Sequence, residues 1–237
     1  MKVEIIPVID VLGGKVVHAR GGIRTQYPVL QSVLSAHCEP LSVIADLLAW
    51  HAFSTIYIAD LDAILEQQQN TALYKSLGEQ FPQITFLLDA GIHSLENWQY
   101  FVDFSNIKPV IGSETLSDIA WLSEPEVRQK SILSLDFQHG QFLGEPPLIQ
   151  QPILWAETII AMNIDHIGSQ SGPDFELLST LQNKALNSEI IAAGGVRSEQ
   201  DLIDLASRGI EQVLVASALH DGKITKQTVE KLKLKCP

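Results

Sequence analysis

The sequence predicts a (β/α)8 TIM barrel, an α/β fold in which eight parallel strands alternate with helices. Three observations predict it. Eight short apolar runs recur along the 237 residues, amphipathic stretches separate most of them, and the two halves of the chain repeat one another. An α/β barrel fills about 200–250 residues as one unit. Because no linker or change in composition divides the chain, we expect residues 1–237 to form a single domain.

The predicted strands are nearly continuous in apolar character, as strands buried on both faces of a parallel sheet require. They span residues 3–10, 55–60, 84–89, 109–112, 131–136, 158–164, 189–193 and 211–216. A doubly wound open sheet is the structural alternative. It is disfavoured because the glycine-rich phosphate turn that follows the first strand of such a sheet is missing.

Helices are expected between most of these strands, because polar or proline start signals precede the amphipathic stretches. The predicted helices span 41–51 after Pro40, 71–80 after Asn70, 95–101 after Ser94, 198–208 opening at Ser198, and 225–232. The fifth helix should be shortened to a turn or two. Three prolines at 146, 147 and 152 leave only residues 153–157 able to coil, and an extended excursion is expected around His139 and Gly140.

The internal repeat indicates two duplicated half-barrels. The segment 90–94 matches 194–198, so that Gly91 corresponds to Gly195, 104 positions later, and Ser113 corresponds to Ser217 at the same offset. Asp10 and Asp136 also correspond, each with a glycine four residues later. A duplicated half-barrel supplies two equivalent ligand sites, which points to a small phosphorylated metabolite with two anionic ends.

The composition of the chain limits the kinds of partner and the cell compartment that we expect for it. Sixteen basic and 28 acidic residues give a net charge of −12, which disfavours nucleic acid because its phosphates are repelled. No apolar run reaches the roughly 18–20 residues that a membrane span needs. The start of the chain resembles a strand rather than a signal peptide, and Cys38 and Cys236 lack metal-ligand spacing. We expect a cytoplasmic protein, and its oligomeric state is left open.

Aspartates at the strand ends are the candidate catalytic groups, because the carboxyl ends of barrel strands converge on one face. Asp10 and Asp136 hold duplicated positions and are the candidate acid–base pair, one ionised and one protonated. Asp89 is a weaker catalytic candidate, and Asp60 and Asp62 are expected to hold the following loop. The alternative for each is a loop cap that accepts backbone N–H bonds. Acid–base chemistry on sugar phosphates needs no metal or other cofactor, so none is expected.

Phosphate binding is expected where glycines allow the backbone to approach a ligand and leave N–H groups free. The candidate phosphate-binding residues are Gly91, Gly112, Ser113, Gly194, Gly195, Ala216 and Ser217. A tight turn that needs positive φ is the alternative for each glycine. Recurrence one half-barrel apart favours the phosphate interpretation. His18, Arg20 and Arg24 in the long first loop are further candidate anion contacts.

An ordered set of motifs resembles the HisA/HisF family of histidine biosynthesis. The motifs are Ile5 to Asp10, Gly14 to Val17, Ala59 to Ala63, Ala193 to Val196 and Val215 to Leu219. The resemblance covers nearly the whole chain. It implies a TIM barrel that binds a bis-phosphorylated ribonucleotide, with Asp10 and Asp136 at the acid–base positions and with the phosphate sites named above.

Three departures from that family pattern weaken the isomerase assignment. Ile167 stands where the resemblance implies the isomerase's second catalytic acid, His18 stands where a basic residue is usual, and Glu114 replaces a small residue. Together with Ser169 to Asp174, they look more like the HisA/HisF-related branch of archaea and methylotrophs. We expect substrate contacts from His18, Asp89, Glu114 and Ser169.

Three functional hypotheses follow. The first is an aldose–ketose isomerase like ProFAR isomerase. The second is a paralogue, such as a lyase or condensing enzyme, that acts in the synthesis of a one-carbon cofactor (methanofuran or tetrahydromethanopterin). The third is a non-catalytic barrel that binds a phosphorylated metabolite.

Overall fold

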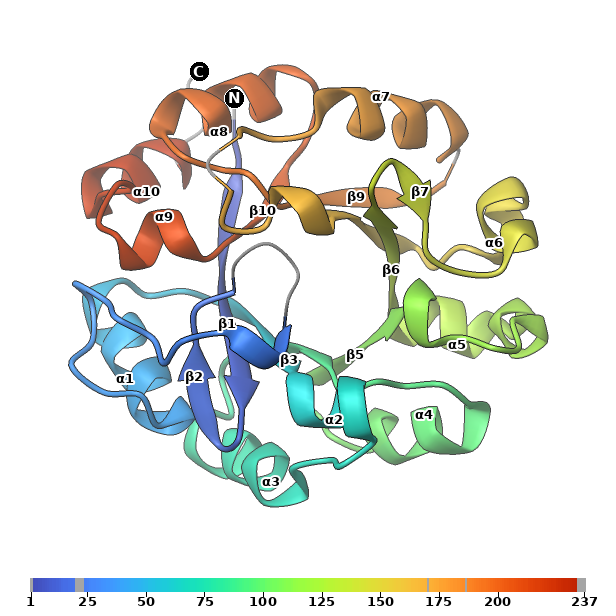
Figure 1. The fold of residues 1–237 in the computed structure, drawn as a ribbon, viewed down its shortest axis with the longest axis horizontal. Helices are drawn as coiled ribbons and strands as arrows, with labels where there is room; N and C mark the ends of the chain where they lie inside the picture. Colours follow the sequence, from blue (N-terminus) through green and yellow to red (C-terminus); the bar gives the residue numbers. More distant parts are fainter. Residues whose placement is uncertain (1, 20–23, 170, 186, 234–237) are drawn as a thin grey trace.

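The computed structural model describes residues 2–19, 24–169, 171–185 and 187–233, and these form the predicted barrel. Arg20 and Cys236 lie outside the described residues. Figure 1 looks down the barrel, with the strands in a ring and the helices around it. The parallel strands are β1 (Glu4–Leu12), β3 (Thr55–Asp60), β4 (Thr85–Asp89), β5 (Ile107–Gly112), β6 (Ile132–Gln138), β8 (Thr158–Asn163), β9 (Glu189–Ala193) and β10 (Gln212–Val215).

The register of these strands closes the sheet. Each strand pairs in parallel with its neighbour, and β10 pairs with β1, so that Ile5 lies opposite Val213. The predicted strands agree with the observed ones to within two residues at every end. Apolar runs bounded by turn residues therefore predicted the barrel strands well.

Helices α1 (Pro40–Trp50), α3 (Thr71–Gln80), α4 (Leu95–Val102), α8 (Glu199–Ser207) and α10 (Lys226–Lys233) confirm the predicted helices. Three of the predicted caps form. The side chains of Asn70, Ser94 and Ser198 accept hydrogen bonds from the third backbone N–H that follows each of them. These bonds satisfy N–H groups that the first turn of a helix leaves without a partner.

Several further helical elements were not predicted. They are α2 (Leu61–Glu66), α5 (Pro125–Lys130), α7 (Phe175–Lys184), α9 (Ser217–His220) and the 3-10 helices Arg24–Gln26, Ser113–Thr115, Ala120–Ser123, Pro152–Leu154 and Ile164–His166. Helix α7 carries a start signal, because Asp174 accepts a hydrogen bond from the backbone N–H of Leu177. No helix among the described residues is both long enough and apolar enough to cross a membrane.

The fifth helix is short, as predicted, but the expected position was wrong. Helix α6 spans Pro146–Gln150, so it begins at the prolines that were expected to prevent it. Proline is tolerated in the first turn because its missing N–H would have no partner there. The excursion before it is the predicted one, since β7 (Gln141–Phe142) pairs antiparallel with β6.

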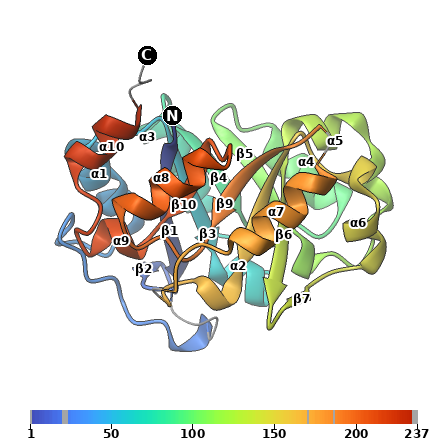
Figure 2. The same cartoon turned by 90° about the horizontal axis from the view of Figure 1, so that it is seen from above.

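The half-barrel repeat extends to the hairpins that rise from the barrel mouth. Strand β2 (Lys15–Val17) folds back on β1 as β7 folds back on β6. Both turns use two residues with positive φ, Gly13 with Gly14 and His139 with Gly140. Figure 2 shows both hairpins and α2 at the same end of the barrel.

Each hairpin turn is held by an aspartate from the neighbouring strand end. Asp62 Oδ2 accepts a hydrogen bond from the Gly13 N–H at 2.7 Å, and Asp165 Oδ2 accepts one from the His139 N–H at 2.5 Å. Both aspartates therefore serve the loops that frame the mouth, and both carboxylates are engaged there.

The core has two layers. Inside the barrel, buried side chains come from every parallel strand, including Ile6, Leu87, Val110, Ile160 and Leu214. Outside, a larger cluster fills the space between the strands and the helices, and Trp98, Trp121 and Trp155 belong to it. The inner layer therefore fills the interior of the barrel below the carboxyl ends of the strands with apolar side chains.

Asp60 holds the loop that precedes α3. Its carboxylate is fully buried and accepts hydrogen bonds from the backbone N–H groups of Ala63 and Asn70, both at 3.2 Å, and from the Tyr74 hydroxyl at 2.5 Å. This arrangement gives Asp60 the loop-holding role expected for it.

Asp60→Asn should therefore lower the free energy of unfolding by about 1–3 kcal/mol, because the amide cannot accept every one of these bonds. Urea denaturation measures the loss, with Tyr74→Phe, which removes the hydroxyl donor to Asp60, measured for comparison. Unchanged stability in Asp60→Asn would contradict the loop-holding role.

Candidate active site

A cavity opens at the carboxyl ends of the barrel strands. One part of its wall carries the strand-end acids Asp10, Asp89, Glu114 and Asp136, together with Tyr57 from inside the barrel. The opposite part carries Gly194, Gly195, Ala216, Ser217 and the basic residues His166, Arg197 and Lys223. We call these two parts the acidic wall and the glycine wall.

Asp136 is held rigidly in the acidic wall. Its carboxyl group is buried, and it accepts hydrogen bonds from the Ser134 hydroxyl at 2.6 Å, the Ser113 hydroxyl at 3.1 Å and the Glu114 backbone N–H at 3.3 Å. Burial, and secondly the negative charge of Glu114, raise the pKa of Asp136 to about 6. The group can thus gain or lose a proton near neutral pH.

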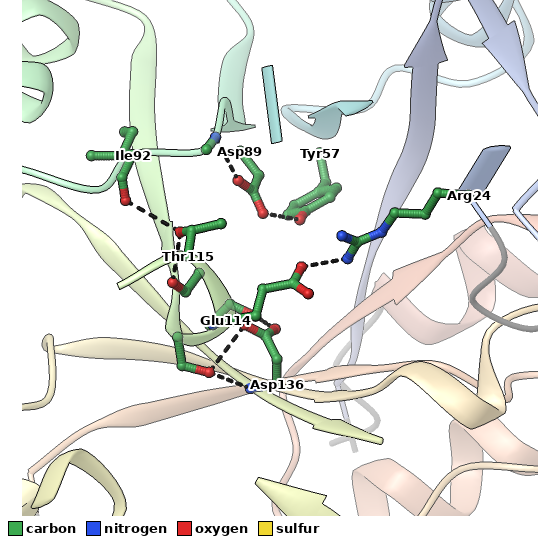
Figure 3. Close-up of polar contacts among 11 residues, drawn as sticks. Arg24, Tyr57, Asp89, Ile92, Glu114, Thr115 and Asp136 are labelled. Atoms are coloured by element: carbon green, nitrogen blue, oxygen red, sulfur yellow. Dashed lines mark hydrogen bonds and ion pairs between the residues drawn. The ribbon is translucent and has the colours of Figure 1, made fainter. Parts of the chain in front are cut away.

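Asp89 lies beside it on the other side of Gly112. Its carboxyl group accepts hydrogen bonds from the Gly91 N–H at 3.2 Å and from the Tyr57 hydroxyl at 3.4 Å. Burial, and secondly the charge of Asp136, raise the pKa of Asp89 to about 7. Figure 3 shows Asp89, Tyr57 and Asp136 directed toward the same space.

Asp10 faces this space from β1. Among the described residues, no hydrogen bond to its carboxyl group is formed, whereas Asp89 and Asp136 each receive several. Burial raises the pKa of Asp10 to about 7, and the positive charge of Arg24 partly opposes that rise. Asp10 is therefore the acid of the cavity with the most freedom to bond a ligand.

An ion pair crosses the mouth. The guanidinium of Arg24, from the first loop, donates to the carboxylate of Glu114, which follows β5 (Figure 3). Each side chain is about one-fifth exposed, 22% in both cases. The pair connects residues that lie 90 positions apart in the sequence and places one positive charge over the acidic wall.

The glycine wall is built from a close backbone contact. Gly195 has φ of 83°, and a Cβ atom there would lie 2.0 Å from the Gly172 carbonyl oxygen, so only glycine fits. Ser217 lies beside it, and its hydroxyl shares a 2.9 Å hydrogen bond with His18 Nε2. No hydrogen bond from the backbone N–H of Gly195 or Ser217 is formed within the described part of the chain.

His166 is a cavity residue that the sequence analysis did not select. Its Nδ1 lies 2.7 Å from the Gly172 carbonyl oxygen. Because a carbonyl oxygen only accepts, Nδ1 must carry a proton, and in a neutral ring Nε2 is then the basic nitrogen. Ile167, the next residue, also lines the cavity. The loop after β8 therefore has an imidazole, that of His166, beside the position where the expected acid is replaced by Ile167.

The predicted site residues divide into two groups. Those that line the cavity are Asp10, Asp89, Glu114, Asp136, Gly194, Gly195, Ala216 and Ser217. Gly91, Gly112, Ser113, His18 and Ser169 lie behind the wall or outside it. Ser113 and His18 are buried and bond Asp136 and Ser217, while the Ser169 hydroxyl is exposed and shares a 2.7 Å hydrogen bond with that of Ser171.

Tyr57, His166, Arg197 and Lys223 were missed. Tyr57 could have been found, because it alternates with Ala59 on the inward face of its strand. Lys223 follows the short helix α9 and has no sequence motif that marks it.

Comparison with known proteins gives a family and several relatives. The family model described as "Histidine biosynthesis protein" matches residues 4–225. An uncharacterized protein of Methanocaldococcus jannaschii is 30% identical over 92% of this chain and 94% of its own length. Phosphoribosyl imidazole-4-carboxamide isomerases of Leuconostoc mesenteroides and Bacillus cereus are 27% and 28% identical, over 93% and 95% of this chain and 96% and 97% of theirs.

The protonation of Asp89 predicts a pH-dependent stability. Its pKa is about 7 in the folded protein against an ordinary value of 3.8, so its contribution to stability is present at low pH and is lost as the pH rises through about 7. Asp89→Asn keeps the shape without the charge. It should stabilise the protein more at pH 8 than at pH 5, with a difference of about 2–3 kcal/mol between the two pH values.

Denaturant unfolding of both proteins at the two pH values measures this difference. An equal effect of Asp89→Asn at both values would show that Asp89 titrates at its ordinary pKa.

Proposed function

Since the chain belongs to the histidine biosynthesis protein family, as the resemblance to HisA and HisF predicted, we propose that it is an enzyme that transfers protons on a phosphorylated metabolite. The first candidate reaction is an aldose–ketose isomerisation like that of ProFAR isomerase, with Asp10 and Asp136 as the acid–base pair. The relatives named above as isomerases support this reaction type.

The observation that carries the proposal is the pair of desolvated carboxyl groups at one mouth. An aldose–ketose isomerisation takes a proton from one substrate atom and gives one to another, so it needs a base and an acid that face the same ligand. Asp10 and Asp136 face one cavity, and their pKa values of about 7 and about 6 allow one to be ionised while the other keeps its proton.

The glycine wall supports a phosphate-bearing substrate. The N–H groups of Gly195 and Ser217 have no acceptor among the described residues. Lys223 and Arg197 line the same wall, where Lys223 lies 3.7 Å from an Asp221 oxygen and Arg197 is bonded to Asp201. Backbone N–H groups beside a cation are a suitable site for a phosphate dianion. Binding there would place the rest of the ligand toward Asp10 and Asp136.

A second candidate is a paralogous enzyme with another phosphorylated substrate, such as one in one-carbon cofactor synthesis. The observation that favours it is the wall after β8. Ile167 stands at the position where the isomerase pattern places an acid, and Asp165 cannot replace it because its carboxylate holds the His139 turn. Growth of a strain that lacks the isomerase, with and without this gene, separates the two candidates.

Asp10→Asn should keep the fold and the affinity for phosphate but lower turnover about 10²–10⁴-fold, because the amide is nearly isosteric and cannot accept the proton. Asp136→Asn should do the same. Steady-state kinetics measures the loss, and Asp60→Asn, which is expected to affect mainly stability, is the control variant. Full activity in Asp10→Asn would contradict both enzymatic candidates and would favour a barrel that binds without catalysis.

Restoring the missing acid separates the isomerase from the paralogue. If the chain is an isomerase that has lost one acid, Ile167→Asp should raise isomerase activity above that of the wild type. The assay is conversion of the phosphoribosyl imidazole carboxamide, with Ile167→Asn as the uncharged control. An inactive Ile167→Asp protein, with Asp10-dependent turnover of another phosphorylated substrate, favours the paralogue.

A further inference from the structure

We propose that Glu114 restricts the cavity to ligands with a single phosphate, which binds the glycine wall, while the acidic wall receives an end that carries no phosphate. The sequence repeat predicts two equivalent phosphate sites. The two walls differ, however, and only the glycine wall is suited to bind a phosphate. This inference rests on the proposed function, because it takes the phosphate site of the glycine wall as given, and it favours the second candidate, because the isomerase resemblance implies a substrate with two phosphates.

The repeat itself shows where the two walls differ. At the offset of 104 that relates Gly91 to Gly195 and Ser113 to Ser217, Asp89 corresponds to Ala193 and Glu114 corresponds to Ala218. All four of these differing residues line the cavity. Two carboxyl groups therefore replace two methyl groups at the wall where a second phosphate would bind.

The hydrogen-bond donors of the acidic wall are already used. The Gly91 N–H bonds Asp89, and the Ser113 hydroxyl and the Glu114 N–H bond Asp136, at 3.1–3.3 Å. In the glycine wall the Gly195 N–H, which corresponds to the Gly91 N–H, has no acceptor among the described residues, and the Ser217 hydroxyl shares its hydrogen bond with His18 Nε2 rather than with a carboxylate. A phosphate at the acidic wall would have to compete with carboxylates for every one of these donors.

Space and charge act in the same direction. Ser113 is fully buried behind the wall, and neither Ser113 nor Gly91 lines the cavity, whereas their counterparts Ser217 and Gly195 do. The Glu114 carboxylate occupies the opening with its partner Arg24 (Figure 3). A phosphate dianion there would be repelled by Glu114, and its presence would raise the cost of ionising Asp89 and Asp136.

The test compares two probes that differ by one phosphate, ribulose 5-phosphate and ribulose 1,5-bisphosphate, by titration calorimetry at pH 8. The wild type should bind the bisphosphate no more tightly than the monophosphate. Glu114→Ala introduces the residue of the other half-barrel and frees Arg24. It should raise the ratio of bisphosphate to monophosphate affinity at least tenfold, and Asp89→Ala with Glu114→Ala should raise it further.

Two controls make the result decisive. Glu126→Ala removes an exposed glutamate that pairs with Lys130 and should leave the ratio unchanged. Ser217→Asp, which places a carboxylate in the glycine wall, should abolish binding of ribulose 5-phosphate. A wild type that prefers the bisphosphate tenfold, or a folded Glu114→Ala protein with an unchanged ratio, overturns this proposal alone. Failure of both probes to bind the wild type overturns the phosphate site and this proposal together.

Discussion

The removal of three aspartate carboxyl groups from water, at the ends of β1, β4 and β6, is the constraint on which the candidate site depends. A carboxylate loses hydration when it is buried, so its protonated form becomes favourable at a higher pH. The pKa values of Asp10, Asp89 and Asp136 rise to between about 6 and about 7 for this reason. Ionisation of these buried groups lowers the stability of the folded barrel at high pH. The same burial provides groups that exchange protons near neutral pH.

The barrel keeps these groups in place through its repeated framework. Hairpins with two positive-φ residues follow both β1 and β6, and Asp62 and Asp165 hold their turns by the same bond to a backbone N–H. The framework is therefore symmetric while the ligand-facing residues are not. Asp89 and Glu114 make one wall acidic, and alanines at the matching positions leave the other wall open to an anion.

The sequence was sufficient for the barrel and for much of the site. Buried parallel strands require continuous apolar runs, and caps such as Asn70 and Ser94 mark helix starts by a local bond, so both can be recognised from neighbouring residues. The position of α6 was wrong because proline was treated only as a helix breaker, whereas Pro146 and Pro147 occupy the first turn.

Other features could not be predicted, because they depend on contacts between distant segments. The pairing of Arg24 with Glu114 joins two loops, and the hydrogen bonds that direct the Ser113 hydroxyl and the Glu114 N–H to Asp136 depend on how β5 and β6 meet. The repeat identified these residues as equivalent to those of the glycine wall. The repeat could not show that the hydrogen-bond donors of the acidic wall are already bonded to the carboxyl groups of Asp89 and Asp136.

The most direct test of this account is a titration of the aspartate carboxyl carbons by nuclear magnetic resonance, with assignments from single Asp→Asn variants. Asp10 should titrate near pH 7 and Asp136 near pH 6, and each midpoint should move when the other acids of the wall are removed. Midpoints near 4 for both groups would show that water reaches them freely, and that result would contradict the acid–base pair.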